Sequence, residues 1–501
     1  MDAHQSRIVK KRYWILPILL LLSTAVFGQT PFKDFLTRVN RLTNSAEKSA
    51  VVDSFFSNTR FPYAELDPAS PTGYAAYFVY RGTSSAVVSA GDFNNWNANA
   101  PDRLQQLPGT TFWYLGKNFE STARLDYKLV LNGSTWILDP THNKTVAGGF
   151  GPNSELAMPQ YVQPEEIQLR PNIPHGRIET LTMASQFLNN SRTVKIYLPP
   201  DYDTSTRQPG VLIVHDGLEY LSLAYMDRVL DDLHARKEIA TPIAIFIPPV
   251  NRNPEYYQNQ RDLFGRFIVE EVLPYVEGRY RVSKSVRQRA NLGASAGGHI
   301  AYYLMFKYPQ IFGGGAGQSS YISAELQALA AAATDTSLRF YLDVGTYDLS
   351  GFPQMNRNWR TQLSGRGFKV RYAEYYEGHS WGNWRAHVDD ALRFLFPPEP
   401  ATGVKQIEQI PARFALQQNA PNPWSISSSA GTKLIFSLAE PAAVNLKVVN
   451  VLGQTLWQQQ WLRLNVGKYE LPLRALLSPG IYFYQLQTPE RILTKKMIVL
   501  P

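Results

Sequence analysis

One serine in this sequence stands in a setting that favours nucleophilic chemistry. Ser295 lies at the centre of a Gly-x-Ser-x-Gly-Gly string, with Gly293 before it and Gly297 after it. A reactive serine on a sharp strand-to-helix turn needs such small neighbours, because the strained backbone brings them into close contact. The following helix would aim its first amides at the serine and stabilise negative charge that develops there. The string therefore predicts a serine nucleophile.

An acid and a base follow this serine in the order Ser, Asp, His, which serine hydrolases with this kind of turn use. Asp348 comes just after the apolar run 339–344, and His379 comes just after the run 370–375. Groups at the carboxyl ends of parallel strands meet at one edge of a sheet, so we expect the three side chains to converge. His379 would then accept the proton of Ser295, and Asp348 would orient the imidazole.

Other residues compete for these roles. Asp343 lies inside the strand run and is the alternative acid, whereas Asp348 lies beyond the end of the run. Among the histidines, His215 and His299 also come near the motif. Neither combines the chain order with a position at the end of a strand, as His379 does.

Backbone amides are the expected oxyanion donors. One is the amide of Ala296, which follows the nucleophile, and the other is near Gly217 or Leu218, just after the apolar run 211–214. Losing one such donor costs on the order of 3 kcal/mol of transition-state stabilisation. The chain has no cysteine, which excludes thiolate metal sites and a cysteine nucleophile, and the chemistry needs no metal and no cofactor.

Alternating strands and helices surround these residues. The apolar strand runs are 194–198, 211–214, 243–247, 290–292, 312–316, 339–344 and 370–375, and the helical stretches are 227–237, 262–278, 298–308 and 356–365. Strands separated by helices predict an α/β fold with a mostly parallel sheet and helices on both faces.

The segments on either side have other patterns. Short alternating runs separated by Gly, Asn and Pro turns predict a β-sandwich before the α/β domain and a smaller one after it. The expected segments are a helical segment at 29–70, an all-β domain at 71–165, the α/β domain at 175–400, a linker at 401–415 and the small sandwich at 416–501.

Residues 1–28 have the features of a secretory signal peptide. Basic residues up to Arg12 precede the apolar run 15–27, and Val26 and Gly28 fit the cleavage positions. The run is shorter than the roughly 20 residues that span a bilayer. We expect the mature chain to begin at Gln29 and to have no transmembrane anchor after processing.

Charge does not indicate a nucleic-acid partner. The net charge is +9, but most of the excess lies in residues 1–28 and 416–501. The part that carries the candidate site is nearly neutral, so we expect no polyanion there.

Residues 190–396 resemble the esterase D family, which includes enterochelin esterases, feruloyl and acetylxylan esterases of carbohydrate esterase family 1, and mycolyltransferases. The matching pieces are 196–202, 215–217, 271–276, the Ser295 turn, 345–348, 378–379 and 384–385. The resemblance implies an α/β-hydrolase fold with nucleophile, acid and base at Ser295, Asp348 and His379. Candidate substrate contacts are His215, Asp216, Trp381, Trp384 and Arg385. Ala296 departs from the family, many of whose members carry a larger residue there, so the accepted acyl and leaving groups stay open.

The preceding β domain carries three recognisable stretches, at 88–96, 127–130 and 136–140. With them it resembles the early-set immunoglobulin-like domains of carbohydrate-binding module family 48. Trp96 and Trp136 would either stack on sugar rings or pack within the sandwich and against the esterase.

The C-terminal segment carries four recognisable stretches, at 419–423, 451–454, 477–482 and 495–500. With them it resembles the sorting domain of the type IX secretion system of Bacteroidota. The resemblance implies export to the cell surface or medium, the secretion machinery as a partner, and removal of the tail.

Together these features predict a secreted serine carboxylic-ester hydrolase that removes feruloyl or acetyl groups from plant polysaccharide. Two alternatives stay open. One is an enterochelin esterase that cleaves a siderophore trilactone, and the other is a surface carbohydrate-binding protein with an inactive hydrolase domain.

Overall fold

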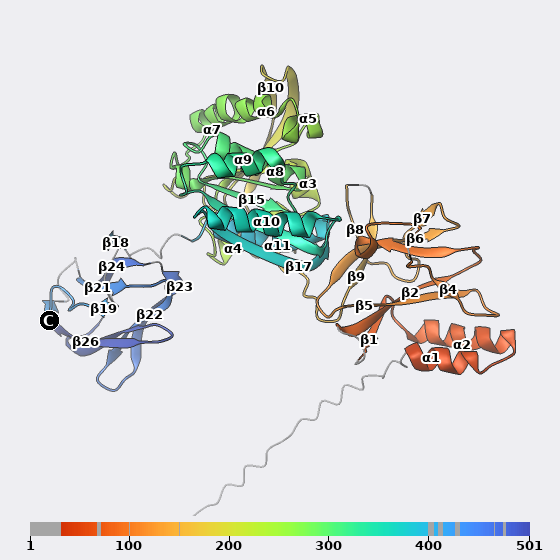
Figure 1. Ribbon diagram of the computed structural model, residues 1–501. Helices are drawn as coiled ribbons and strands as arrows, with labels where there is room; N and C mark the ends of the chain where they lie inside the picture. Colours follow the sequence, from red (N-terminus) through yellow and green to blue (C-terminus); the bar gives the residue numbers. More distant parts are fainter. Residues whose placement is uncertain are drawn as a thin grey trace, which may run out of the picture.

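The computed structural model describes residues 32–67, 72–99, 101–149, 151–398, 405–408, 414–425, 431–464, 466–473 and 477–500. The predicted signal peptide therefore lies outside the described residues. Figure 1 shows three bodies, which we call the N-terminal unit (residues 32–158), the central unit (177–396) and the tail unit (415–500). Among the described residues, no helix is long and apolar enough to cross a membrane.

The central unit is built on one sheet in the order β10-β11-β13-β12-β14-β15-β16-β17. Its strands are β10 (Arg177–Ser185), β11 (Asn190–Leu198), β12 (Val211–His215), β13 (Ile243–Ile247), β14 (Arg289–Ala294), β15 (Gly314–Gln318), β16 (Arg339–Tyr347) and β17 (Lys369–Gly378). Pairing is antiparallel through β10, β11 and β13 and parallel from β13 to β17. The mostly parallel α/β fold that the sequence predicts is confirmed. β15 begins at Gly314, two residues later than the start of the predicted run 312–316.

Helices cover both faces of this sheet, because apolar side chains project from both faces. Two separate apolar clusters result, one around Phe264, Ile300 and Trp359 and the other around Leu230 and Leu392. The helices are α3 (Gly217–Ser222), α4 (Met226–Ala235), α5 (Arg252–Tyr257), α6 (Arg261–Arg266), the π-helical η2 (Phe267–Val272), α7 (Leu273–Arg279), the short η3 (Val286–Gln288), α8 (Ala296–Lys307), α9 (Ala324–Ala332), α10 (Phe352–Gly365) and α11 (Trp381–Leu395).

The N-terminal unit begins with α1 (Phe32–Asn40) and α2 (Ser45–Asn58), which pack on a sheet in the order β1-β2-β5-β4. Phe32 anchors them by stacking on Tyr77 with ring centroids 4.0 Å apart. The strands of the unit are β1 (Tyr63–Leu66), β2 (Gly73–Arg81), β3 (Val87–Gly91), β4 (Gln105–Gln106), β5 (Phe112–Glu120), β6 (Arg124–Leu131), β7 (Thr135–Ile137), β8 (Thr145–Val146) and β9 (Asn153–Ala157), with the short helix η1 (Asp92–Asn94). The predicted helical segment at 29–70 contains α1 and α2, but it also contains β1, which pairs antiparallel with β2.

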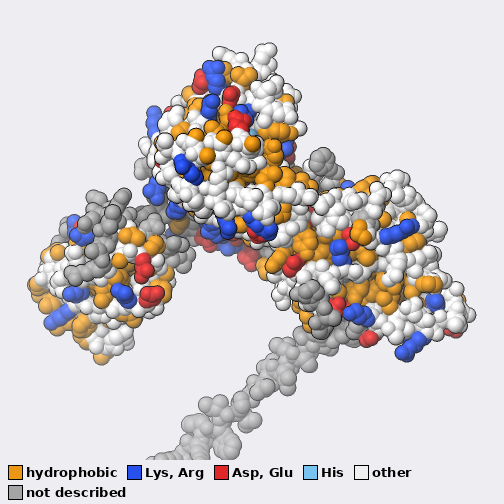
Figure 2. Space-filling view, viewed as in Figure 1, with side chains coloured by type: hydrophobic (Ala, Val, Ile, Leu, Met, Phe, Trp, Pro, Cys, Tyr) orange, Lys and Arg blue, Asp and Glu red, His pale blue; other side chains and the backbone are white. Residues whose placement is uncertain are grey.

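One feature of the N-terminal unit was not predicted. Its second sheet, in which β6 pairs with β3, β7 and β9, continues the sheet of the central unit, because β6 pairs with β17 at Arg124 and Glu377. Figure 2 shows the two units meeting in a continuous surface.

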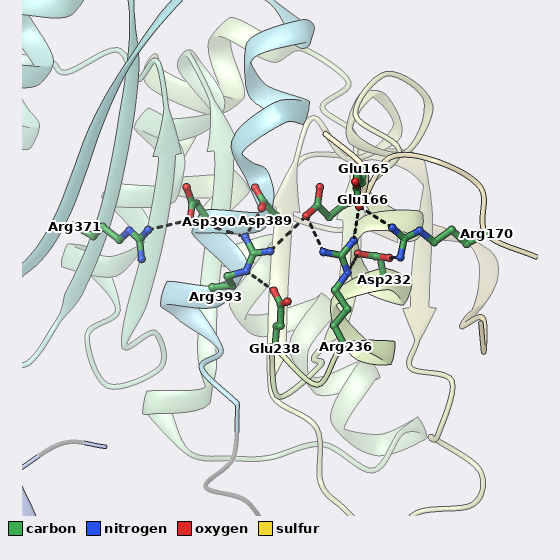
Figure 3. A network of polar contacts seen from close by, with 10 residues as sticks. All are labelled: Glu165, Glu166, Arg170, Asp232, Arg236, Glu238, Arg371, Asp389, Asp390 and Arg393. Carbon is green, nitrogen blue, oxygen red and sulfur yellow. Dashed lines mark hydrogen bonds and ion pairs between the residues drawn. The ribbon is translucent and has the colours of Figure 1, made fainter. Parts of the chain in front are cut away.

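The segment that connects these two units is fastened to the central unit by ion pairs (Figure 3). Glu166 lies between Arg236 of α4, at 3.7 Å, and Arg393 of α11, at 3.6 Å. Arg170 of the same segment pairs with Asp232 at 2.7 Å. The connection therefore follows the surface of the central unit in a defined path.

The tail unit consists of two sheets with apolar side chains between them. Its strands, together with one that precedes it, are β18 (Lys405–Glu408), β19 (Ala415–Leu416), β20 (Trp424–Ser425), β21 (Thr432–Leu438), β22 (Ala442–Asn450), β23 (Thr455–Leu464), β24 (Gly467–Leu473), β25 (Gly480–Gln487) and β26 (Ile492–Leu500). β18 lies in the predicted linker 401–415 and pairs with β24. The sequence did not indicate this pairing.

Candidate active site

Ser295 occupies the sharp turn between β14 and α8. Its φ of 57° is unusual for a residue with a side chain, and its amide donates to Gln318 O at 2.8 Å. A Cβ on Gly293 would come within 2.3 Å of Gly297 O, and one on Gly297 within 2.9 Å of Asp216 Oδ2. Gly293 is therefore required by the close approach of the Gly297 backbone, as the motif indicated, and Gly297 lies close to the Asp216 carboxylate.

Asp348 and His379 form a hydrogen-bonded pair at the same edge of the sheet. Asp348 follows β16, His379 follows β17, and Asp348 Oδ1 lies 2.7 Å from His379 Nδ1. The Asp348 carboxylate is buried and also accepts from the amide of Leu349 at 2.7 Å. A buried carboxylate that accepts two hydrogen bonds in this way fixes the imidazole tautomer and ring orientation.

The imidazole of His379 is held between two aromatic rings. Phe352 and Trp384 each meet it edge-on, with ring centroids 5.1 Å away. Among the described residues no hydrogen bond of standard geometry joins the Ser295 hydroxyl to His379. Such bonds are often long before substrate binds. The two residues nevertheless follow β14 and β17 of one parallel sheet.

The competing acid and bases have other partners. Asp343 Oδ2 accepts from Gln318 Nε2 at 3.0 Å, and burial raises the pKa of Asp343 to about 7. His215 is fully buried against Tyr256, and burial lowers its pKa to about 3. His299 lies 3.0 Å from Ser323 Oγ, and burial lowers its pKa to about 4. Of the three histidines, His379 alone is paired with a carboxylate.

The expected oxyanion amides lie at two helix starts. Ala296 begins α8 and Gly217 begins α3, and within the described residues the amides of Ala296, Gly217 and Leu218 have no hydrogen-bond acceptor. A Cβ on Gly217 would come within 2.4 Å of Ile247 N, so only glycine allows α3 to start so close to β13. Because Asp216 also touches Gly297, the two helix starts are neighbours.

Asp216 has a partner that the sequence did not reveal. Arg252 of α5 binds it with two hydrogen bonds of 2.8 Å, and Arg252 Nη2 lies 3.4 Å from Ala294 O. This pair fixes the turn before Gly217 against the turn at the nucleophile. A single arginine with no periodic context gives no signal for such a role.

The structure places the other predicted substrate contacts deeper than expected. His215 has no exposed surface, Trp381 packs on Tyr220, and Trp384 packs on His379, so that both tryptophans are buried. Arg385 lies 3.6 Å from Glu155 of the N-terminal unit. His215 therefore lies in the core and not on a surface that a substrate reaches.

The two tryptophans of the N-terminal unit differ in environment. Trp96 is half-buried and donates from Nε1 to Asp92 Oδ1 at 3.0 Å. Trp136 is 42% exposed. Sugar stacking thus stays a prediction, and Trp136 is the more accessible ring.

In the part of the chain that the structure describes, no group of three or more His, Asp or Glu side chains could hold a metal ion.

Comparisons with known proteins agree with this geometry. Residues 185–395 match the family described as "Putative esterase", and residues 421–500 match the "Secretion system C-terminal sorting domain". The uncharacterized protein YjcH of Bacillus subtilis is 24% identical over 234 residues, which cover 44% of this chain and 97% of that protein. An endo-1,4-beta-xylanase/feruloyl esterase of Xylanibacter ruminicola is 22% identical and covers 67% of this chain and 46% of that protein.

Solved structures of enterobactin esterases share the fold. The enzyme from Shigella flexneri, determined in the presence of enterobactin, superposes with a TM-score of 0.58 at 21% identity and covers 68% of this chain and 97% of its own. The ferric enterobactin esterase of Salmonella typhimurium gives a TM-score of 0.58 at 19% identity, with 68% and 98% covered. The likeness extends beyond the central unit.

Proposed function

We propose that this protein, a carboxylic ester hydrolase by virtue of the esterase domain at residues 185–395, works through Ser295, His379 and Asp348. The observation that supports this mechanism best is the 2.7 Å pair of His379 and Asp348 at the sheet edge that carries the strained Ser295 turn. A histidine oriented by a buried carboxylate is the base that a serine hydroxyl needs at neutral pH.

The acylation step follows from these positions. Ser295 Oγ attacks the ester carbonyl carbon while its proton moves to Nε2 of His379, and the Nδ1 proton stays in the bond to Asp348. The carbonyl oxygen becomes an oxyanion that accepts from the amide of Ala296 and from that of Gly217 or Leu218. His379 then gives its proton to the departing alkoxide, which leaves Ser295 acylated.

Deacylation repeats the sequence with water. His379 takes a proton from the water that attacks the acyl carbonyl, and the same amides hold the second oxyanion. When the carbonyl re-forms, Ser295 Oγ leaves and takes the proton from His379. The products are the free acid and a regenerated serine.

The expected location of the protein limits the classes of substrate that it can meet. The type IX sorting domain at residues 421–500 implies export machinery and a protein that is secreted or at the cell surface. In our proposal residues 1–28 first direct the chain across the inner membrane. An extracellular esterase with an exposed Trp136 on an adjoining β-sandwich fits feruloyl or acetyl groups attached to plant polysaccharide. The similarity to a feruloyl esterase over 67% of the chain supports this choice.

A siderophore trilactone is the second candidate. The shared fold with enterobactin esterases over 68% of this chain favours it. The two candidates differ in charge and shape, so one assay can separate them.

A substrate panel tests the proposal. Methyl ferulate, acetylated xylan and ferric enterobactin would be offered to the wild-type protein and to Ser295→Ala. We expect the wild type to act on one of the first two, and Ser295→Ala to lose several orders of magnitude of turnover. Preference for ferric enterobactin would favour the second candidate. Equal activity of the two proteins would refute the mechanism, and Ser364→Ala, an exposed serine on α10, is the matched control.

A further inference from the structure

We propose that Arg124 of the N-terminal unit is a positioning residue for His379, so that the esterase site is completed by residues outside the domain at 185–395. This inference rests on the proposed roles of Ser295 and His379. It adds that the N-terminal unit holds the loop of the catalytic base and is not a detachable binding module.

Three successive contacts from the N-terminal unit surround His379. Glu377 pairs with Arg124 through the strand contact of β17 with β6. Gly378 packs on Asp92, where an added Cβ would come within 2.0 Å of the carboxyl carbon. Ser380 Oγ accepts a hydrogen bond from Arg124 Nη1 at 3.2 Å. The residues before and after His379 are therefore both held from outside the central unit.

The guanidinium of Arg124 is itself rigidly held. It is fully buried, Nη2 lies 2.7 Å from Asp126 Oδ1, and Nε donates to Glu155 Oε2 at 3.1 Å. Burial lowers the pKa of Arg124, but the negative charges around it, Asp126 and Glu155 first among them, raise it, and the net pKa lies above the ordinary value. The Arg124 guanidinium is thus permanently charged, with Nη2 and Nε directed at the two carboxylates and Nη1 directed at the Ser380 hydroxyl.

Ser380 transmits this contact to the helix behind His379. Its hydroxyl caps α11 by accepting from Asn383 N at 3.4 Å, and Asn383 Nδ2 donates to Gly378 O at 2.9 Å. A Cβ on Gly382 would come within 2.0 Å of Arg124 Nη1, so Arg124 lies across the first turn of α11. Gly378, Ser380 and Asn383 are therefore linked by hydrogen bonds around the loop that carries His379.

The position of Arg124 is not one that helix stability favours. A helix N-terminus carries a partial positive charge, and a cation placed there is repelled. Asp126 and Glu155 on β6 and β9 offset that repulsion. The gain from this placement is the fixed bond to Ser380, which supports a role in orientation.

The loop of Asp348 is held from the same side. Asn95 Oδ1 accepts from Ser350 N at 2.8 Å, and Tyr347 donates to Glu120 Oε2 at 2.7 Å. The N-terminal unit therefore borders both members of the His379 and Asp348 pair. A small shift of this unit would alter the geometry on which proton transfer depends.

Ser380→Ala is the variant that tests the inference, since it removes the contact but keeps Arg124 paired. Removing Arg124 would leave Asp126 and Glu155 buried without a cation and endanger folding. For Ser380→Ala we expect kcat on an aryl acetate to fall about tenfold to a hundredfold, with KM changed by less than about threefold. Ser380→Thr keeps the hydroxyl and is expected to regain most of this loss.

The matched control is Asn44→Ala, because Asn44 caps α2 in the same way and is remote from the site. It should lose stability like Ser380→Ala but keep the wild-type kcat. A second readout is the rate at which a fluorophosphonate labels Ser295, which needs the base and should fall in Ser380→Ala by the same factor as kcat. Arg124→Lys keeps the positive charge but not the planar guanidinium group. Its kcat and its labelling rate should both fall about tenfold.

The outcomes separate the two proposals. A folded Ser380→Ala with wild-type kcat and labelling rate would overturn the positioning role and leave the serine mechanism intact. An equal loss in Asn44→Ala would reduce the effect to general stability and also overturn it. A wild-type protein that hydrolyses esters as fast as Ser295→Ala does would overturn the mechanism and this inference together.

Discussion

The N-terminal unit and the tail unit are both rich in short strands, yet they relate to the central unit in opposite ways. The N-terminal unit shares a strand pairing, the buried Arg124 and several hydrogen bonds with the two loops that carry Asp348 and His379. Between described residues we find no hydrogen bond or ion pair that joins residues 414–500 to residues 32–398.

This difference shows that strand content does not reveal whether a flanking unit belongs to an active site. The decisive features are a few polar contacts between chain segments far apart in sequence. We therefore expect changes at the junction of the N-terminal and central units to alter catalysis, and changes in the tail unit to alter only export.

The largest effect is expected at the acid that the N-terminal unit borders. Asp348→Asn should reduce kcat by about four orders of magnitude, because an amide stabilises neither the required tautomer nor the imidazolium. Asp343→Asn, which changes a residue inside β16 five positions before Asp348, is the matched variant and should retain activity within a few fold. Turnover of an aryl acetate measures both. A larger loss in Asp343→Asn would exchange the two roles.

Asp343 also predicts a pH dependence of stability. Burial raises the pKa of Asp343 to about 7, so the folded state holds a proton that the unfolded state has lost above pH 4. Its contribution to stability therefore falls as pH rises from about 4 to 7, by on the order of 4 kcal/mol. Asp343→Asn should gain stability relative to wild type over that range. Urea unfolding at several pH values measures it, and a constant difference would contradict the buried carboxyl.

A smaller loss is expected where the N-terminal unit packs on the loop of the base. Gly378→Ala places a methyl group against Asp92, which should displace the loop, lower kcat by about a hundredfold and cost about 1–3 kcal/mol of stability. Gly365→Ala is the control, because nothing lies within 4 Å of its added Cβ. Calorimetry and turnover would be compared for both. Wild-type turnover in a folded Gly378→Ala would show that this junction does not control His379.

The central fold and the meeting of Asp348 and His379 at its sheet edge could be predicted from sequence because both have local signals. Apolar residues in the strands and helices of the central unit follow patterns typical of each element. The glycines around Ser295 indicate a turn that only small residues allow. The end of a strand then locates Asp348 and His379 without knowledge of any contact.

The junction of the units could not be predicted, because it has no local signal. Arg124 and Ser380 are separated by 256 positions, and β6 alternates like any sandwich strand. The sequence predicts Trp381 and Trp384 as substrate contacts but not that α11 buries its apolar face, which includes both rings, on the central sheet. Burial of that face depends on the packing of the whole unit, which motif positions do not report.

The smallest catalytic effect is expected from removal of the tail unit. A chain that ends at Pro398 keeps every described hydrogen bond and ion pair of the central and N-terminal units, so kcat and KM on an aryl acetate should stay within about twofold of wild type. In the native host the same chain should remain in the periplasm, because in our proposal the signal peptide carries it only across the inner membrane, and the sorting domain matched at residues 421–500 is missing. Cell fractionation with an activity assay would decide. A truncated chain that reaches the medium as well as the full-length chain would show that the tail unit does not direct export, whereas a truncated chain with much lower kcat would show that the tail unit, like the N-terminal unit, supports the site.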